Sequence, residues 1–266
     1  MALYMNRVKT PPTPSIVSHY CNVISSTRLS INTFEIELHA PRGTVLHYQA
    51  GQYLQLALNL KGDGQLQSLS YSIANSFNPE KPERLQLFIQ TGGETADKVL
   101  KHLLEQRERS RPIKVVMAKG LAFLQTNLNV PHLLIAAGSG ISKIKCLTEE
   151  ILKQRPDANV DIYWSNKNID DFYLLDEFQS WVDKNENLGF IPVLEASNTE
   201  WSGRSGYLYE VIEEDFDDLD GTQAYLCGSP QMVYGTIDKL KASRLKEHNC
   251  YSDVFEYAPR DQKEAI

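Results

Sequence analysis

The hydrophobic pattern of this chain changes its period near residue 130, and this change limits the possible folds more than any other feature. Before that point apolar and polar residues alternate, as Phe34, Ile36 and Leu38 do with the two glutamates between them. A period of two is typical of strands with one buried face. After that point the continuous apolar run 133–137 ends in a glycine turn, and an amphipathic segment follows. The sequence therefore predicts an all-β domain followed by an α/β domain.

Residues 15–127 are predicted to fold as a small antiparallel β-barrel with one helix. Apolar residues at helical spacing, beginning at Ala96 and ending at Leu104, indicate that helix. Residues 1–14 contain three prolines and little apolar content, and we expect them to form a flexible arm. The strands of the barrel are expected at 34–38, 54–58, 85–90 and 113–117.

Residues 128–266 are predicted to fold as a Rossmann-like domain with a parallel sheet. The run 133–137, the turn 138–140 and the helical pattern that starts at Ile141 form the opening of a βαβ unit. Apolar strands then alternate with amphipathic helices along the rest of the chain. The further strands are expected at 160–164, 190–195 and 224–227.

The chain carries a net negative charge, because 27 lysines and arginines are outnumbered by 34 aspartates and glutamates (27 − 34 = −7). That sign disfavours nucleic acid and anionic membrane surfaces as partners. No apolar run approaches the roughly 20 residues of a membrane span, and none resembles a secretory signal, so we expect a cytoplasmic location. The histidines are scattered and no two cysteines form a CxxC pair, so no metal site is expected.

Six short stretches combine small, polar and aromatic residues that could bind a ligand: SLSYSIAN (68–75), AAGSGIS (136–142), YWSNK (163–167), WSGRSG (201–206), CGSPQM (227–232) and YSDVFEY (251–257). In sequence and in order they resemble the ferredoxin-NADP reductase superfamily, and most closely its bacterial NAD(P)H:flavin oxidoreductases. The resemblance extends over nearly the whole chain from about residue 15.

The resemblance implies an enzyme that transfers a hydride from NADH or NADPH to the N5 atom of a flavin. The reaction would take place at the cleft between a flavin-binding barrel and an NAD(P)-binding domain, since ligand sites often lie between domains. The flavin would be FAD or FMN, or riboflavin that is taken up as a substrate. The cofactors would supply the chemistry, and the protein would orient them.

In the first stretch, the resemblance assigns Tyr71 to the face of the flavin ring and Ser72, as a catalytic residue, to the nitrogen that takes the hydride. Ile73 and Ala74 would complete the cofactor-binding strand, and Thr91 belongs to a second flavin segment. The residues alone favour an ordinary strand, so these roles depend on the resemblance.

For the nucleotide, the resemblance assigns Gly138 and Gly140 to a phosphate, since glycine permits close approach to the free N–H groups of a helix N-terminus. Cys227 would be the second catalytic residue, near nicotinamide C4, and Lys167 would lie near the adenosine ribose. The residues alone are also typical of a tight turn, a buried cysteine and a solvated lysine. The other residues assigned to the nucleotide are Ser139, Ser142, Gly228, Ser229 and Met232.

The chain departs from the superfamily pattern at three places. Leu69 stands where the superfamily has an arginine that meets a flavin phosphate or the ribityl chain, and Lys143 stands where it has a proline. The second glycine-rich flavin segment is reduced to Thr91-Gly92-Gly93. We therefore expect the flavin to be bound loosely rather than as a tight prosthetic group.

Three functions remain open from the sequence. The first is a flavin reductase that releases reduced flavin, and it fits the departures at Leu69 and Lys143. The second is a flavoprotein that passes electrons to a separate oxygenase or iron-sulfur protein. The third is a catalytically impaired nucleotide-binding scaffold. Arg204 could hold the nucleotide or fix a loop under any of the three.

Overall fold

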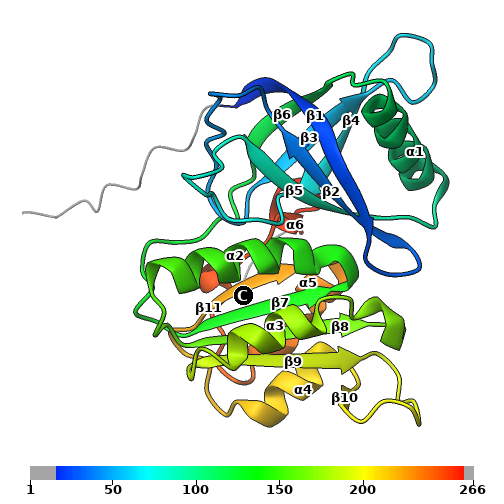
Figure 1. The fold of residues 1–266 in the computed structure, drawn as a ribbon. Helices are drawn as coiled ribbons and strands as arrows, with labels where there is room; N and C mark the ends of the chain where they lie inside the picture. Colours follow the sequence, from blue (N-terminus) through cyan, green and yellow to red (C-terminus); the bar gives the residue numbers. More distant parts are fainter. Residues whose placement is uncertain (1–15, 261–266) are drawn as a thin grey trace, which may run out of the picture.

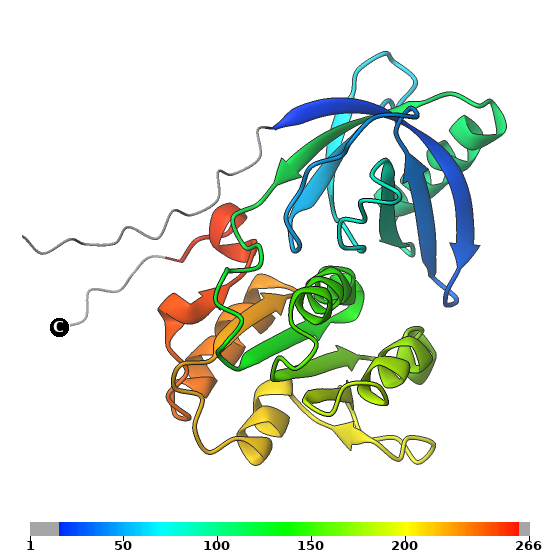
Figure 2. The ribbon, with the colours of Figure 1, turned by 60° about the vertical axis from the view of Figure 1, so that its left-hand side comes forward.

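The computed structural model describes residues 16–260, and the chain forms two sheets with a helix between them (Figures 1 and 2). The first sheet is antiparallel and curled, and the second is parallel with helices on both faces. The expected fold class is confirmed. The arm expected over residues 1–14 lies outside the described residues.

The first sheet has the strand order β4 (Gln67–Ser72), β3 (Tyr53–Leu58), β6 (Ile113–Lys119), β1 (Val17–Arg28), β2 (Thr33–His39), β5 (Arg84–Gln90). Buried Leu54, Leu56 and Leu58 alternate with half-buried residues along β3, so one face of that strand closes the barrel core. The two edges, β4 and β5, lie where the curled sheet comes round on itself. Helix α1 (Glu94–Glu108) follows β5, as the spacing of its apolar residues predicts.

The sequence pattern does not reveal β1 or β4. In β1, Tyr20 and Ile24 are 59% and 44% exposed, so apolar residues occur on both of its faces and the alternation is lost. In β4, three of six residues are serines and none is fully buried. Pairing with β6 and β3 holds these two strands, rather than an apolar face of their own.

The second sheet is parallel throughout, with the order β10 (Arg204–Ser205), β9 (Leu188–Leu194), β8 (Val160–Asn166), β7 (His132–Ala137), β11 (Gln223–Cys227), β12 (Cys250–Tyr251). The order reverses between β7 and β11, and ligands of such sheets bind at the carboxyl ends of the strands on either side of that point. The boundary expected at 127/128 falls in the segment between β6 and β7, and we keep it as a proposal.

Helices cover both faces of the parallel sheet. Helices α2 (Ile141–Gln154) and α3 (Leu175–Val182) pack on the face toward the barrel, and α4 (Leu208–Asp215) and α5 (Pro230–Leu240) pack on the other. A short helix, α6 (Val254–Tyr257), follows β12 and lies between the two halves (Figures 1 and 2).

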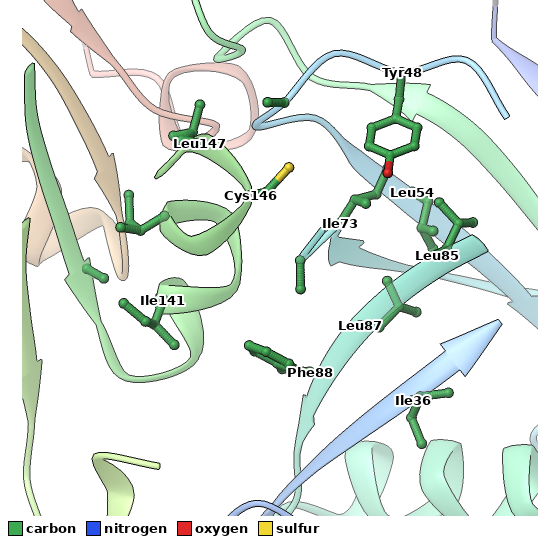
Figure 3. Close-up of a cluster of buried hydrophobic side chains, with 14 of the residues drawn as sticks. Ile36, Tyr48, Leu54, Ile73, Leu85, Leu87, Phe88, Ile141, Cys146 and Leu147 are labelled. Atoms are coloured by element: carbon green, nitrogen blue, oxygen red, sulfur yellow. The ribbon is translucent and has the colours of Figure 1, made fainter. Parts of the chain in front are cut away.

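Helix α2 joins the two halves through a shared hydrophobic core. One buried cluster runs from the barrel strands through α2 to the parallel sheet. Figure 3 shows Cys146 of α2 pointing toward the barrel residues Tyr48 and Ile73, with Ile141 and Leu147 of the same helix in the same cluster. Because α2 is covered on opposite sides, it buries more than the single apolar stripe that its sequence predicts. No helix in residues 16–260 is long and apolar enough to cross a membrane.

His132, at the start of β7, is 1% exposed, and burial lowers its pKa. The folded chain therefore keeps this ring neutral at pH values where the unfolded chain, with a pKa of about 6.5, has taken up a proton. We expect the free energy of unfolding to fall as the pH drops below about 6.5, by at most ~1.4 kcal/mol per pH unit from this residue. Urea unfolding measured from pH 7.5 to 5 should show that the free energy of unfolding falls less steeply with pH in His132→Gln than in the wild type. An unchanged decline would assign the effect to other groups.

Candidate functional site

Ser72 and Cys227, the two expected catalytic residues, meet between the two halves of the chain. Ser72 ends β4 of the barrel, and Cys227 ends β11 of the parallel sheet. The Ser72 hydroxyl lies close enough to Cys227 to lower the pKa of its thiol. Burial raises the pKa of the Cys227 thiol to about 11, so the thiol is protonated at neutral pH. It can orient a neighbour, but it is not a thiolate nucleophile.

A buried ion pair lies beside this contact. The Lys143 Nζ atom donates to Asp253 Oδ2 at 2.8 Å, and the Lys143 side chain is 1% exposed. The pair lies close enough to the thiol that, after burial, the Lys143 charge lowers the pKa of Cys227 and the Asp253 charge raises it. Because its ammonium is enclosed and paired, Lys143 is not available as an anchor for a flavin phosphate. Sequence reasoning quoted YSDVFEY but did not single out Asp253.

Tyrosines from both halves complete the surroundings of the ion pair. Tyr53 of β3 is paired with Ser72 across the strands, and burial raises its pKa, with Asp253 adding to the effect. Tyr257 of α6 is 65% exposed; burial and then the charges of Cys227 and Asp253 raise its pKa. These aromatic rings flank the carboxylate and the thiol.

The C-terminal segment is tied to the barrel side of the site. The Glu256 Oε1 atom accepts from the Leu121 N–H at 2.7 Å. Gly120, with φ of +95°, lies against Tyr53 and Asp253, and a Cβ there would be 3.0 Å from Asp253 Oδ1. The site is therefore built from β3, β4, β11, α2 and α6 at once.

The expected flavin residues of β4 divide into two groups. Tyr71 and Leu69 are half-buried and pair across the strands with Leu54 and Leu56, so they lie on the inner side of the barrel edge. Ser72, on the opposite side, points to Cys227. Ile73 and Ala74, by contrast, are fully buried, and their N–H groups donate to carbonyls of the barrel. Their side chains belong to the core and do not face the site.

Thr91 and the start of α1 do not form an anion site. The Thr91 N–H and hydroxyl both donate to the Asn32 carbonyl, at 2.6 and 2.9 Å. The Gly92 N–H donates to Asp97 Oδ1 at 3.0 Å, and Glu94 adds a second carboxylate to the first turn of α1. These carboxylates lie where a flavin phosphate would bind, and their negative charge would repel it.

The start of α2, unlike that of α1, carries no acidic side chain. Gly138 takes a positive φ of +55°, and the Gly140 Cα lies so close to β11 that a Cβ would be 2.2 Å from the Cys227 carbonyl oxygen. The first turn of α2 has no acidic residue and no capping side chain, so it suits the phosphates of a dinucleotide. Ser142 is 5% exposed and donates to the Ser139 carbonyl at 2.9 Å, so its hydroxyl shapes the turn.

The remaining expected nucleotide residues lie around the same edge of the sheet. Ser229 caps α5 by accepting from the Met232 N–H at 3.2 Å, and Gly228 packs against Met232. Lys167 is exposed just after β8 and makes no ion pair within residues 16–260. Arg204 binds Glu214 and Asp215 of α4, which favours a role in the fold over one in nucleotide binding.

Comparison with known proteins agrees with this geometry. Residues 134–238 match the family model described as the oxidoreductase NAD-binding domain. A probable flavin reductase of Photobacterium leiognathi is 30% identical over 79% of this chain and 87% of its own length. The chain belongs to the ferredoxin-NADP reductase superfamily, in its flavin reductase branch. A crystal structure of the Amycolatopsis cytochrome P450 reductase GcoB superposes with a TM-score of 0.78 at 21% identity, over 90% of this chain and 69% of that one.

Some relatives of this flavin reductase branch are longer than the chain. The CDP-6-deoxy-L-threo-D-glycero-4-hexulose-3-dehydrase reductase of Yersinia pestis is 26% identical over 83% of this chain, but the match spans only 63% of that protein. The activity of such a longer protein as a whole is therefore not carried over to this chain.

Gly140→Ala tests whether the contact between α2 and β11 holds the site together. A Cβ at this position would overlap the Cys227 carbonyl, so α2 must move away, and we expect a loss of several kcal/mol of stability, comparable with other overpacked sites. Gly235→Ala in α5 is the matched control, because a Cβ there meets no atom within 4 Å, and it should stabilise by up to ~1 kcal/mol. Thermal unfolding of both variants measures the difference. Equal stability of the two would contradict the assigned contact.

Proposed function

We propose that the protein is an NAD(P)H:flavin oxidoreductase that uses flavin as a loosely bound substrate. When bound, the nucleotide supplies a hydride and the flavin accepts it, which leaves oxidised nucleotide and reduced flavin. The observation that carries the proposal is the contact of Ser72 with Cys227, because it brings the two expected halves of a hydride path to one point. The flavin reductase relative supports the same reading.

Each part of the site has a separate task in this proposal. Tyr71 packs along one face of the flavin ring, and the Ser72 hydroxyl donates toward the nitrogen that receives the hydride. Cys227 keeps its proton and positions the nicotinamide ring against that hydroxyl. The glycine turn 138–140 and the N-terminal end of α2, which carries no acidic residue, hold the nucleotide phosphates. Holding both rings in place is the main contribution of the protein to the rate.

Two features support loose flavin binding. Leu69 offers no cation to a flavin phosphate, and the first turn of α1 carries Glu94 and Asp97, whose negative charges disfavour a phosphate there. The ring of the flavin, common to riboflavin, FMN and FAD, is then the part that the protein recognises. A flavin held in this way can leave after it has been reduced.

Ser72→Ala and Cys227→Ala should lower turnover on the order of a hundredfold while changing stability little, because a hydrogen bond formed mainly in the transition state can contribute a few kcal/mol. Steady-state NADH and NADPH oxidation with saturating riboflavin or FMN measures this. Ser70→Ala is the matched control, since Ser70 lies on the same strand and contacts only Gln55 among the described side chains. If both site variants fold and keep wild-type turnover, the assignment is wrong.

Leu69→Arg should raise the affinity for FMN roughly ten- to a hundredfold and leave that for riboflavin unchanged, because a charge-assisted hydrogen bond to phosphate is worth about 1.5 to 3 kcal/mol. The wild type should bind riboflavin and FMN with comparable affinity. Fluorescence quenching of riboflavin and of FMN measures the two affinities in the wild type and in the variant. Leu66→Arg, at an exposed leucine just before β4, controls for charge alone. A wild type that prefers FMN a hundredfold would refute loose, phosphate-independent binding.

A reductase that keeps its flavin and delivers electrons to another protein is the second candidate. It is favoured by the match to the longer dehydrase reductase of Yersinia pestis. A yellow protein after purification would favour this candidate, and a colourless one that oxidises NADH only with added flavin would favour the first. The cytoplasm is the location we propose, since all four cysteines are free thiols.

A further inference from the structure

Lys143 places a charge in the interior of the chain. Its side chain, at the start of α2, is 99% buried. Burying an ammonium costs several kcal/mol unless a partner offsets it. Asp253 is that partner, with its Oδ2 atom at 2.8 Å. A buried pair of this kind is weak evidence for stability alone, so its position in the site needs another explanation.

The Asp253 carboxylate is only half satisfied by Lys143. Its Oδ1 atom is buried and has no hydrogen-bond partner, and it is the only carboxylate oxygen in that condition within residues 16–260. Buried polar atoms in native proteins almost always have a partner, and an unpaired one beside reacting groups points to a ligand. Tyr53 and Asp253 Oδ1 both lie against Gly120, and Lys143, which holds Asp253, follows Gly140, which lies against Cys227. This ligand would therefore be at the hydride path.

The charge of Lys143 decides what kind of group this ligand must present. A carboxylate that pairs with an ammonium group accepts hydrogen bonds and donates none. The partner of Oδ1 must then be an N–H or O–H donor. Next to C4 of a nicotinamide ring, that donor is the NH2 of its carboxamide group. Lys143, Asp253 and Cys227 all come from the nucleotide half of the chain, which favours the nicotinamide over the flavin.

We propose that Lys143 is a positioning residue that holds the Asp253 carboxylate in place, with Oδ1 as the acceptor for the carboxamide NH2 of the bound pyridine nucleotide. The inference deepens the proposed function and rests on it. Lys143 does not touch the nucleotide; it acts through Asp253. Ligand entry must open the packing of Tyr53 and Gly120 around Oδ1, since that oxygen is closed to solvent in the free chain.

Two nucleotides that differ in one group test this. NADH carries the carboxamide NH2, and its reduced 3-acetylpyridine analogue carries a methyl group in its place. Isothermal titration without flavin gives both affinities. We expect the wild type to bind NADH about tenfold more tightly than the analogue, as one hydrogen bond to a charged group allows. The ratio should fall to near one in Lys143→Met and should persist in Lys143→Arg.

Lys145→Met is the matched control. Lys145 is a second buried lysine on α2, but its Nζ atom contacts Glu149, Glu177 and Gln86, away from Cys227. This variant can lose stability, but it should keep the tenfold ratio. If Lys143→Met does not fold, the apolar pair Lys143→Met with Asp253→Leu replaces it, because removing both charges of a buried pair is often tolerated. That double variant should also show a ratio near one.

Three results would overturn the inference. The first is a tenfold ratio retained in Lys143→Met, which would leave Lys143 a structural role only. The second is a ratio near one in an active wild type, which would refute the inference and leave the proposed function standing. The third is a loss of riboflavin affinity in Lys143→Met with an unchanged nucleotide ratio, which would place Oδ1 against the flavin. A wild type that binds neither NADH nor NADPH would refute the proposed function as well.

Discussion

The packing of α2 against both sheets is the constraint on which the rest of the structure depends. Its apolar residues belong to one core shared by the barrel and the parallel sheet. Polar contacts fix its rotation: the Glu149 Oε2 atom accepts from the Ser76 N–H at 2.7 Å, and the Cys146 Sγ atom lies 3.1 Å from the Asn75 carbonyl oxygen. Asn75 is the last residue of the flavin stretch 68–75 of the barrel, and Ser76 directly follows it. The helix thereby sets the distance between β4 and β11, and the contact of Ser72 with Cys227 follows from it.

The chemistry of the site depends on which of its helix ends carry acidic side chains and which do not. The first turn of α2 has no acidic residue, whereas the first turn of α1 carries Glu94 and Asp97, and Asp97 Oδ1 accepts from the Gly92 N–H. One helix end therefore suits the phosphates of a nucleotide, and the other does not suit those of a flavin. Between them, Lys143 and Asp253 bring a balanced pair of charges to the thiol.

Much of this arrangement could be predicted from the sequence. The change of period near residue 130 predicts the two classes of sheet, and the resemblance predicts Ser72 and Cys227, which the fold brings together. The resemblance also assigns Ile73 and Ala74 to the cofactor, but side-chain direction alternates along a strand and the chain then turns into the core.

Asp253 and the pairing of Lys143 could not be found in the same way. The two residues are far apart in the sequence, and a buried lysine has no periodic signature. Helix spacing even suggests an exposed position for a charged residue. Only the second layer of packing on α2, which comes from the barrel and the C-terminal segment, explains its burial. The periodicity of a helix predicts which of its faces packs against one neighbouring element. It does not predict burial that arises from several neighbours, as it does at this site.

The ties from residues 253–257 to α2 and to Leu121 have a consequence for how the chain is made. The ribosome synthesises the barrel first. The residues that lie next to β4 in the site, on β11 and α6, are added only later. Until α2 emerges, the barrel exposes the side of Ile73 and Phe88 that α2 later covers. Synthesis interrupted between Tyr251 and Asp253 would therefore yield a chain with both sheets but without the carboxylate of the site.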